Sequence, residues 1–533
     1  MKLSRRDLLR LFFGLPLAVA CKNQREGVPG SIRGANVGLA HRLRDATVER
    51  AAGKAESVTV AIVGAGPGGL VAARRLRQSG LLDFVLFDLE GQSGGSSCYG
   101  TDGVVSYPWG AHYLPQPDDE NRPLREFIAE IGGFESDPVR GEVIREDWLV
   151  RAPEERLFAR GRWHAGLSPA TLLTHEDRLQ LARFQRKLDH WVAWRDGTGK
   201  RAFAVPMRRS SAAAEVRDLD RISAAEWLAA EGLDSSFLRW YVDYACRDDY
   251  GLRANSTSAW AMLFYFTART PRAGAPSAPF LTWPEGNGYL VRRLTEPLGS
   301  RLKLDALVTD VAPTDQGVAL SVFDARQGAL KRYDARYVIL AVPQFVAARI
   351  LRPLREARPT YLDEFSYSPW LVANLHLDSG SEAEGPGGAW DNVLFDSPSL
   401  GYVSATHQTL RERGPTVWTY YNALVDAEPN VARNQLYGAD HESLANAVLG
   451  DLGRAVDVRR RLSRLDVWRW GHAMVSPRVG FMWGGGRERA AEPRGRVFFA
   501  HTDLSGMALF EESFDRGEQA ANQILARLRH GAG

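Results

Sequence analysis

The sequence predicts an α/β fold in which a doubly wound domain with a mainly parallel sheet is interleaved with a second, α+β domain. Its 533 residues, 44% of them hydrophobic, suit a large core that is divided over two domains. Residues 58–88 read as strand, glycine-rich turn, helix and strand, the unit from which parallel sheets are built. Strand-like apolar segments return at Tyr337–Pro343 and Val497–Phe499, so one sheet draws on distant parts of the chain.

The first unit carries the residues expected of a dinucleotide site. Val58–Val63 is an apolar strand, and Phe84–Phe87 is a second strand that ends at Asp88. In such a Rossmann-like unit, glycines allow the tight turn, the approach of a pyrophosphate and the packing of the helix on the strand. The pyrophosphate rests on the helix N-terminus. Asp88 lies 19 residues after Gly69, close to the spacing of about 20 expected for an acid that binds the ribose. The candidate cofactor-binding residues of this unit are Gly64, Gly66, Gly68, Gly69 and Asp88.

The N-terminus has the features of an export signal. Residues 4–9 form a twin-arginine pattern, and the apolar run Leu11–Ala20 follows. This run is too short to span a membrane, which takes about 20 residues. Because the run ends in small residues, we predict a removable signal over residues 1–20 and a periplasmic location. A chance basic amphipathic N-terminus is the alternative.

The residues after this signal are expected to form a tether. Cys21 would be the first residue after cleavage, so a lipoprotein anchored at Cys21 and a simply secreted protein both stay open. Residues 21–56, rich in Gly, Arg and Ala, then lead to the folded body. The other two cysteines, Cys98 and Cys246, could pair in an oxidising compartment, but two buried free thiols are the favoured interpretation.

The composition argues against several classes of function. The formal net charge is only +3 at pH 7, and no basic run interleaves with aromatic residues, so nucleic-acid binding has no support. No cluster of His, Cys and Asp has the spacing of metal ligands, so we expect no metal site. The chain gives no indication of its oligomeric state.

Several further segments resemble the flavin amine oxidase and phytoene desaturase superfamily, and they occur in its order. The phrases YPWGAHY, CRDDYG and FAHTDLSG are similar to those of exported bacterial FAD-dependent oxidoreductases, which are known only as amine oxidase-like or NAD(P)-binding proteins. A plain turn is the alternative for Gly94–Gly95 taken alone. The segments are Gly94–Ser96, Trp283–Leu290, Asp305–Val311, Val497–Asp503 and Glu511–Gly517.

The resemblance implies FAD as the cofactor and assigns further residues to it. Gly94, Gly95 and Ser96 would let the backbone approach the flavin. The strand that contains Val308 would meet the adenine through its backbone. The expected FAD-binding domain is therefore Rossmann-like.

The C-terminal part of the resemblance concerns the flavin end of the cofactor. Asp503 would bond to the ribityl chain. The following helix, with Glu512 in its first turn, would direct its N-terminus at the isoalloxazine carbonyl. His501 departs from the superfamily pattern, which has a small residue there, and can approach the cofactor. No cysteine follows Cys246, so a C-terminal cysteinyl–flavin bond is excluded and we expect noncovalent FAD.

Three residues are catalytic candidates in the substrate pocket. Flavin oxidation needs a dry pocket and few protein acids or bases. His112 belongs to the segment expected beside the flavin, although a histidine bonded to the backbone is the alternative. Trp470 and His472 lie in a segment that resembles the pocket-lining strand before the final flavin strand, where core packing is the alternative.

An acidic helix end offers a second substrate contact. Asp248 and Asp249 could attract a cationic amine, and Tyr250 could offer its ring face. The alternative is a solvated helix end, in which Arg247 neutralises one of the acids.

The expected domains follow from these segments. The FAD-binding domain would consist of residues 57–150, 284–355 and 466–533, and the substrate domain of residues 151–283 and 356–465. Substrate is expected to bind where the two meet. Within the substrate domain, helices are predicted at Asp177–Trp194 and Ala224–Tyr244, and strands at Leu371–Leu377 and Val417–Asn422.

Three functions fit these expectations. The leading hypothesis is an exported FAD-dependent oxidoreductase that removes hydride from an amine, such as a polyamine, with oxygen or an envelope electron carrier as acceptor. The second is desaturation or isomerisation of an apolar lipid, which a membrane tether at Cys21 would favour. The third is a non-catalytic partner protein that keeps FAD as a structural element.

Overall fold

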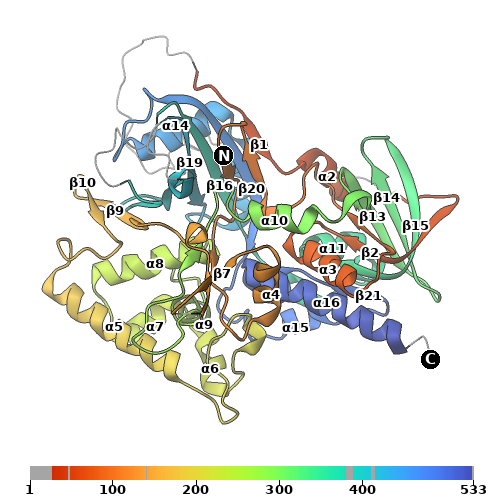
Figure 1. Ribbon diagram of the computed structural model, residues 1–533, viewed down its shortest axis with the longest axis horizontal. Helices are drawn as coiled ribbons and strands as arrows, with labels where there is room; N and C mark the ends of the chain where they lie inside the picture. The colour runs from red at the N-terminus through yellow and green to blue at the C-terminus, as the bar shows by residue number, and fades with distance from the viewer. Residues whose placement is uncertain (1–26, 46–48, 140, 380–387, 410–413, 531–533) are drawn as a thin grey trace, which may run out of the picture.

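The computed structural model describes residues 27–45, 49–139, 141–379, 388–409 and 414–530. The described residues form two large sheets, with a layer of helices below and beside them (Figure 1). The export signal and Cys21 lie outside the described residues. Among the described helices, none combines the length and the apolar character that a bilayer crossing needs.

The first large sheet is the predicted parallel sheet. Its strands run in the order β12-β3-β2-β15-β14-β13, and β21 pairs with β15. The pairs among β12, β3, β2, β15 and β21 are parallel, whereas β13, β14 and β15 form an antiparallel meander. The strands are β2 (Ala55–Val63), β3 (Phe84–Phe87), β12 (Leu302–Lys303), β13 (Ala306–Pro313), β14 (Val318–Asp324), β15 (Ala329–Leu340) and β21 (Val497–Phe499).

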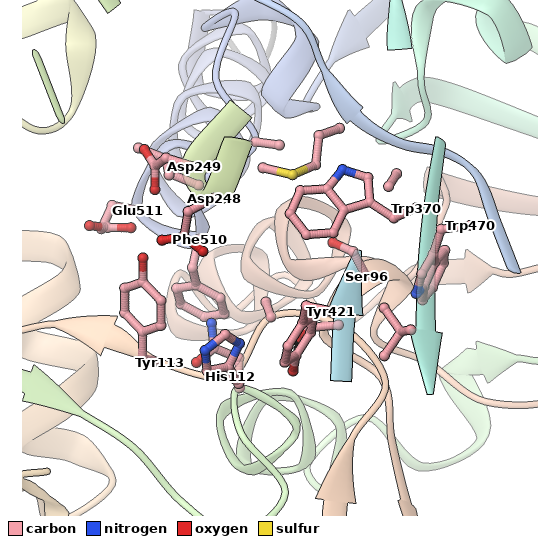
Figure 2. A pocket seen from close by; sticks show the side chains of 18 of the residues that line it. Ser96, His112, Tyr113, Asp248, Asp249, Trp370, Tyr421, Trp470, Phe510 and Glu511 are labelled. Atoms are coloured by element: carbon pink, nitrogen blue, oxygen red, sulfur yellow. Dashed lines mark hydrogen bonds between the residues drawn. The ribbon is translucent and has the colours of Figure 1, made fainter. Parts of the chain in front are cut away.

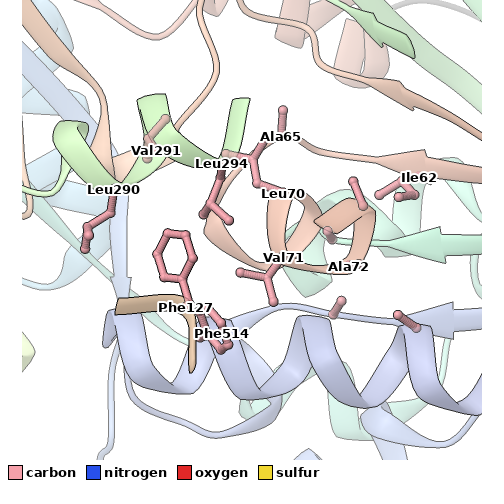
Figure 3. Close-up of a cluster of buried hydrophobic side chains, with 14 of the residues drawn as sticks. Ile62, Ala65, Leu70, Val71, Ala72, Phe127, Leu290, Val291, Leu294 and Phe514 are labelled. Atoms are coloured by element: carbon pink, nitrogen blue, oxygen red, sulfur yellow. The ribbon is translucent and has the colours of Figure 1, made fainter. Parts of the chain in front are cut away.

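Both faces of this sheet are buried, which explains its continuous apolar strands. Val60 and Ile62 belong to the hydrophobic cluster that also contains side chains of the helices α3 (Pro67–Gln78) and α16 (Phe510–His530), and Figure 3 shows Ile62 in this cluster. The intervening Ala61 and Val63 face the opposite cluster, to which α11 (Gln344–Ile350) and α12 (Arg352–Glu356) contribute. Because side chains alternate between the two faces of a strand, β2 contributes to the hydrophobic core on each side of the sheet.

The second large sheet has eight strands in the order β1-β20-β16-β19-β18-β17-β9-β10. The predicted strands at 371–377 and 417–422 are confirmed as parts of β16 and β19. One face packs against α13 (Pro429–Gly438) and α14 (His441–Leu452). The strands are β1 (Ile32–Gly34), β9 (Glu155–Ala159), β10 (Arg162–Ala165), β16 (Tyr367–Leu377), β17 (Asp391–Leu394), β18 (Gly401–Ser404), β19 (Thr416–Ala423) and β20 (Leu462–Val475).

A helical layer accompanies this sheet. The helix predicted at 177–194 is confirmed as α5, which starts at a capping box formed by Thr174 and Asp177. The helical run predicted at 224–244 is two helices, α7 and α8. Gly232, with φ of 64°, ends the first, and the Ser235 side chain caps the second. The helices are α5 (His175–Ala193), α6 (Ala214–Asp218), α7 (Ala224–Ala230), α8 (Ser236–Tyr250) and α9 (Ala259–Thr267).

Smaller elements complete the fold. Two-stranded sheets join β4 to β5, β6 to β11 and β7 to β8. The remaining described elements are α2 (Val37–Asp45), β4 (Tyr99–Thr101), β5 (Ser106–Pro108), β6 (Leu114–Pro115), α4 (Arg122–Glu130), β7 (Phe134–Asp137), β8 (Gly141–Ile144), β11 (Phe280–Leu281), α10 (Gly288–Thr295) and α15 (Gly486–Ala491).

The expectation of a tether is wrong for the described residues between 27 and 56. β1 adds a parallel strand to the edge of β20, and the Ser31 N–H and hydroxyl both donate to buried Asp466 at 2.9 Å. Gly and Arg suggested a linker, but backbone pairing with a distant strand decides the structure of this segment. The predicted domain boundary at residue 466 falls inside β20, which lies wholly in the second sheet.

Candidate active site

A long cavity opens at the carboxyl ends of β2 and β15, with about 1370 Å³ of empty space. This is the edge of an open parallel sheet at which ligands bind. Hereafter it is called the long cavity. Eight of the predicted cofactor-binding residues line it, from three separate parts of the chain. They are Gly64, Gly66, Gly68, Asp88, Gly95, Ser96, Val308 and Asp503.

The glycine turn between β2 and α3 has the geometry that an anion site requires. Gly64 has φ of 100°, and a Cβ on Gly69 would lie 1.9 Å from the Gly64 carbonyl oxygen. Gly69 therefore serves the packing of helix on strand and does not line the long cavity. Gly66 does line it, and a Cβ there would meet no protein atom within 4 Å. The turn leaves space in front of the α3 N-terminus, where the helix macrodipole favours a phosphate.

Two carboxylates lie at the end of β3. Asp88 accepts hydrogen bonds from the N–H groups of Ala65 at 2.6 Å and Glu90 at 2.8 Å, so it fixes the glycine turn. Burial raises the pKa of Asp88 to about 6. Glu90 also lines the long cavity, and it accepts a hydrogen bond from the Asn36 N–H at 2.9 Å. Sequence reasoning missed Glu90, although an acid two residues beyond Asp88 was a visible signal.

Asp503 offers an unsatisfied acceptor in the wall of the long cavity. Its Oδ2 accepts from the Gln344 N–H at 2.7 Å and the Tyr367 hydroxyl at 2.5 Å. Its Oδ1 is buried and has no hydrogen-bond donor among the described residues. His501 Nδ1 lies 2.9 Å from that oxygen but accepts the Asp503 N–H. An oxygen in this state fits a ligand hydroxyl.

Two other predicted residues do not line the long cavity. Gly94, with φ of 124°, shapes the turn that brings Gly95 and Ser96 to the wall, and its N–H donates to the Ala65 carbonyl at 2.8 Å. Glu512 lies in the first turn of α16, but its carboxylate accepts from the Met207 N–H at 2.6 Å. Burial and the nearby Asp515 raise the pKa of Glu512 to about 7.

A second cavity adjoins the long cavity and has about 840 Å³ of empty space. Hereafter it is called the acidic cavity. Ser96, Trp470 and the segment 508–510 line both cavities, and Figure 2 shows the side chains around the acidic cavity. Three carboxylates and one guanidinium line the acidic cavity, together with aromatic rings. Strands β16, β19 and β20 of the second sheet, the end of α8 and the start of α16 contribute to its wall.

His112 and Trp470 both line the acidic cavity, and their catalytic role stays a prediction. Burial lowers the pKa of His112 to about 4, so its ring is neutral, and it stacks on Tyr421 with 4.7 Å between ring centroids. The Trp470 indole donates to the Trp109 carbonyl at 2.7 Å. Trp370, its partner on β16, forms part of the same wall. These contacts hold the rings in place.

His472 lies elsewhere. It lines the long cavity but not the acidic cavity, and it stacks on Phe345 with 4.4 Å between centroids. Desolvation, followed by the charge of Arg433, lowers the pKa of His472 to about 3. The structure therefore separates His472 from the other two catalytic candidates.

The acidic end of α8 faces the acidic cavity. Asp248 and Asp249 both line it, and no described residue donates a hydrogen bond to Asp248. Burial and the neighbouring Asp249 raise the pKa of Asp248 to about 7. Burial raises the pKa of Asp249 to about 6, against the charge of Arg269. The solvated helix end is excluded, and Arg247 pairs with Asp243 at 3.3 Å.

An ion pair that sequence reasoning missed closes one side of the acidic cavity. Arg269 follows α9, and its Nη2 lies 3.1 Å from Oε1 of Glu511 in α16. Both side chains are almost fully buried, with 8% and 5% exposure. Burial opposes the charge on Arg269, but Glu511 and Asp249 outweigh it and keep the pKa of Arg269 above its ordinary value. No local sequence signal links the two residues.

The two described cysteines lie apart from these cavities. Cys98 and Cys246 are buried free thiols, as the sequence favoured. Burial raises the pKa of both thiols well above the ordinary value. Neither thiol lines the long or the acidic cavity, within the part of the chain that the structure describes.

Comparisons with known proteins agree with this geometry. Residues 67–525 match the family model described as flavin containing amine oxidoreductase. The chloroplastic protoporphyrinogen oxidase of Oryza sativa subsp. japonica is 32% identical over 117 residues, 22% of this chain. That of Nicotiana tabacum is 28% identical over 102 residues, 19% of this chain. The chain matches only about a fifth of the length of these relatives, 21% and 18% respectively.

Solved structures share the fold. Putrescine oxidase bound to putrescine aligns with a TM-score of 0.66 at 17% identity, over 89% of this chain and 100% of that one. Cyclohexylamine oxidase from Brevibacterium oxydans IH-35A aligns with a TM-score of 0.62 at 16% identity, over 89% and 100% of the two chains. A fatty acid isomerase from P. acnes aligns with a TM-score of 0.59 at 14% identity, over 87% of this chain and 98% of that one. Identities this low establish the fold alone.

Proposed function

Because this chain belongs to the flavin-containing amine oxidoreductase family, we propose that it binds FAD noncovalently in the long cavity and oxidises a cationic amine in the acidic cavity. The chain is an enzyme of this family, and the family carries a flavin. The structures that it resembles include oxidases of putrescine and of cyclohexylamine, both of them amines. That resemblance supports the substrate class, and the acidic cavity supports it independently.

The residues of the long cavity fit a dinucleotide. The turn at Gly66 would receive the pyrophosphate, and Asp88 with Glu90 would take the ribose hydroxyls. Asp503 Oδ1 would accept from a ribityl hydroxyl. A noncovalent cofactor is proposed because neither Cys98 nor Cys246 lines the cavity. When bound, a flavin accepts hydride at its N5 atom.

The single observation that carries the substrate class is the Asp248 carboxylate. It faces a largely aromatic cavity, without a hydrogen-bond donor from the described residues, and beside a flavin site. A carboxylate that lines an aromatic cavity without a partner is costly, and an alkylammonium group would supply both a charge and donors. Asp249 and Glu511 add two more carboxylates to the cavity, whereas Arg269 adds one positive charge. The charge of the cavity therefore favours a cation.

The chain's residues would then orient the amine and manage its proton. Trp370, Trp470 and Tyr421 exclude water and offer ring faces to a cation. An ammonium group must lose a proton before its carbon can give up hydride. The Asp248 carboxylate, whose pKa is raised to about 7, can accept that proton at its oxygen. His112 is neutral and would act only as a wall or a hydrogen-bond partner.

Anaerobic mixing with a panel of primary amines, diamines and polyamines tests this proposal. We expect the flavin absorbance near 450 nm to bleach with at least one amine, and the matching alcohols to leave it unchanged. A flavin that stays yellow with every amine would reject the substrate class. Bleaching by an apolar lipid in detergent, with none by amines, would select the desaturase or isomerase function instead.

We also propose export by the twin-arginine route, with the periplasm as the location. The support is the pattern at residues 4–9 and the small residues before Cys21, which lie outside the described residues. Cell fractionation of the tagged full chain and of a variant with Arg5→Lys and Arg6→Lys tests this. Retention of the variant in the cytoplasm is expected, and equal fractionation would contradict the route.

A further inference from the structure

A third cavity lies behind the wall of the long cavity that His472 and Tyr367 form. It has about 1360 Å³ of empty space and is open to solvent on one side. Hereafter it is called the basic pocket. Arg349 of α11, Arg433 of α13 and Arg358 line it together with Phe345. None of its lining residues belongs to the acidic cavity.

The basic pocket carries uncompensated positive charge. No described residue donates to, accepts from or pairs with the Arg349 guanidinium. Arg433 donates to the backbone carbonyls of Gly471 at 2.6 Å and Tyr367 at 3.2 Å, so no acid neutralises it. Asp363, the acid of the lining, is hydrogen-bonded to Arg358. Two guanidinium charges therefore remain available to a ligand.

The backbone adds to this potential. α13 begins at Pro429, which lines the pocket, and it is ten residues long. The positive end of its macrodipole therefore lies at the pocket wall. Guanidinium groups and a helix N-terminus are both features that recognise carboxylates, sulfonates or phosphates.

The wall between the basic pocket and the long cavity is aromatic and one side chain thick. His472 and Tyr367 line both spaces. Phe345 extends this wall on the pocket side, 4.4 Å from the His472 ring and 5.0 Å from the Tyr367 ring between centroids. A ligand stacked on Phe345 would lie close to the long cavity without entering it.

We infer that the basic pocket is the docking site of an anionic electron acceptor, which takes the electrons released by the substrate from the far side of the flavin site. The inference rests on the proposed function for the flavin in the long cavity and for the source of those electrons. In the overall reaction the amine becomes an imine and loses two electrons and two protons. An anionic two-electron acceptor, or two one-electron acceptors, takes the electrons, and the protons pass to water. The opposite charges of the two sites would thus direct the amine to the acidic cavity and the acceptor to the basic pocket.

The test compares an anionic with a cationic acceptor. The holoenzyme is reduced anaerobically with dithionite, freed of excess reductant, and mixed with ferricyanide or with a ferrocenium cation at an ionic strength of about 0.1 M. For Arg349→Glu we expect the rate constant with ferricyanide to fall at least about tenfold, because reversal of a facing charge removes electrostatic steering. The rate constant with ferrocenium should stay equal or rise. Since dithionite supplies the electrons, this result does not depend on the amine proposal.

A matched control separates the pocket from net charge. Arg186→Glu makes the same charge change on the exposed face of α5, away from the three cavities. Both rate constants of this variant should stay within about twofold of the wild-type values, because exposed charges beyond the Debye length of about 10 Å are screened.

Binding is measured separately from turnover. Ferrocyanide, the product anion, is titrated calorimetrically into the oxidised protein, whose fold is checked by circular dichroism. We expect binding to the wild type and to Arg186→Glu, and about tenfold weaker binding to Arg349→Glu. Equal ferricyanide rates in all three proteins, or equal ferrocyanide affinities, would overturn the inference.

Discussion

At the scale of the residue, Asp248 is the group on which the proposed substrate recognition depends. Its position at the end of α8 is ordinary for an acid, but it lines the acidic cavity, and no described residue donates a hydrogen bond to it. Burial and Asp249 consequently raise its pKa to about 7. The carboxyl group can therefore change its charge within the physiological range, which an ordinary surface aspartate does not do.

This titration predicts a pH dependence of kcat/KM. Below pH 7 Asp248 is protonated and neutral, and above pH 7 it is an anion that attracts the ammonium group. An alkylamine keeps its proton up to a pH of about 10. For a cationic amine, kcat/KM should therefore rise between pH 6 and pH 8, with a midpoint near 7. Initial rates over this range measure it.

In the variant Asp248→Asn, kcat/KM should no longer rise with pH, because the amide cannot carry the charge. At pH 8 its kcat/KM should be at least about tenfold below that of the wild type. Asp457→Asn removes an exposed carboxylate elsewhere and should keep the wild-type profile. If Asp248→Asn kept the same midpoint, the titrating group would be another residue.

At the scale of the element, the β2–α3 turn is the part of the cofactor site that local sequence defines. Gly64 and Gly69 are needed for the fold, because a Cβ on either would lie 2.4 Å or less from a carbonyl oxygen. Gly66 is different, because a Cβ there meets no protein atom within 4 Å. Its side of the turn faces the long cavity instead.

Gly66→Ala should therefore weaken FAD binding without harming the fold. We expect the FAD affinity to fall at least about tenfold, or about 1.4 kcal/mol, because the methyl group occupies the space of the pyrophosphate. The free energy of unfolding of the apoprotein should hold or rise by about 0.4–1 kcal/mol. Titration of the apoprotein with FAD, and urea unfolding, measure the two.

Gly450→Ala is the matched control, since its Cβ also meets no atom within 4 Å but lies in α14, outside the long cavity. It should bind FAD like the wild type. Unchanged FAD affinity in Gly66→Ala would place the pyrophosphate somewhere else.

At the scale of the whole molecule, residues that are far apart in sequence join the strands of the second sheet and connect its helical layer to α16. β1 reaches from the N-terminal segment to β20, and the Arg269–Glu511 pair joins the helical layer to α16. Both residues of this ion pair also line the acidic cavity, so the same contact supports stability and encloses the proposed substrate site.

Loss of this pair should be costly. Glu511→Ala leaves Arg269 buried and unpaired, and we expect the free energy of unfolding to fall by about 3–5 kcal/mol. Glu296→Ala, which removes an exposed partner of Arg292 and Arg293, should cost at most about 1 kcal/mol. Urea unfolding of both variants gives the comparison. If the free energy of unfolding fell by a similar small amount in both variants, Arg269 would have found another partner or contact with solvent.

Local patterns predicted the elements whose cause is local. The strand–turn–helix–strand unit at 58–88, the helix α5 and the strands β16 and β19 are where their periodicity indicates. The division of the run at 224–244 was missed because its apolar spacing continues across Gly232. The described part of 21–56 was missed because its structure depends on the edge of β20, more than 400 residues away.

The sequence by itself determined the dinucleotide turn, because steric limits on glycine and the dipole of a helix act within a few residues. It also indicated the flavin family through motifs whose spacing is fixed by the cofactor. Only the tertiary structure decided what the acids at 248 and 249 do, since a helix end in water and one in a cavity have the same sequence pattern. Burial is set by every element that packs around a site, and the charge state of a carboxyl group follows from burial.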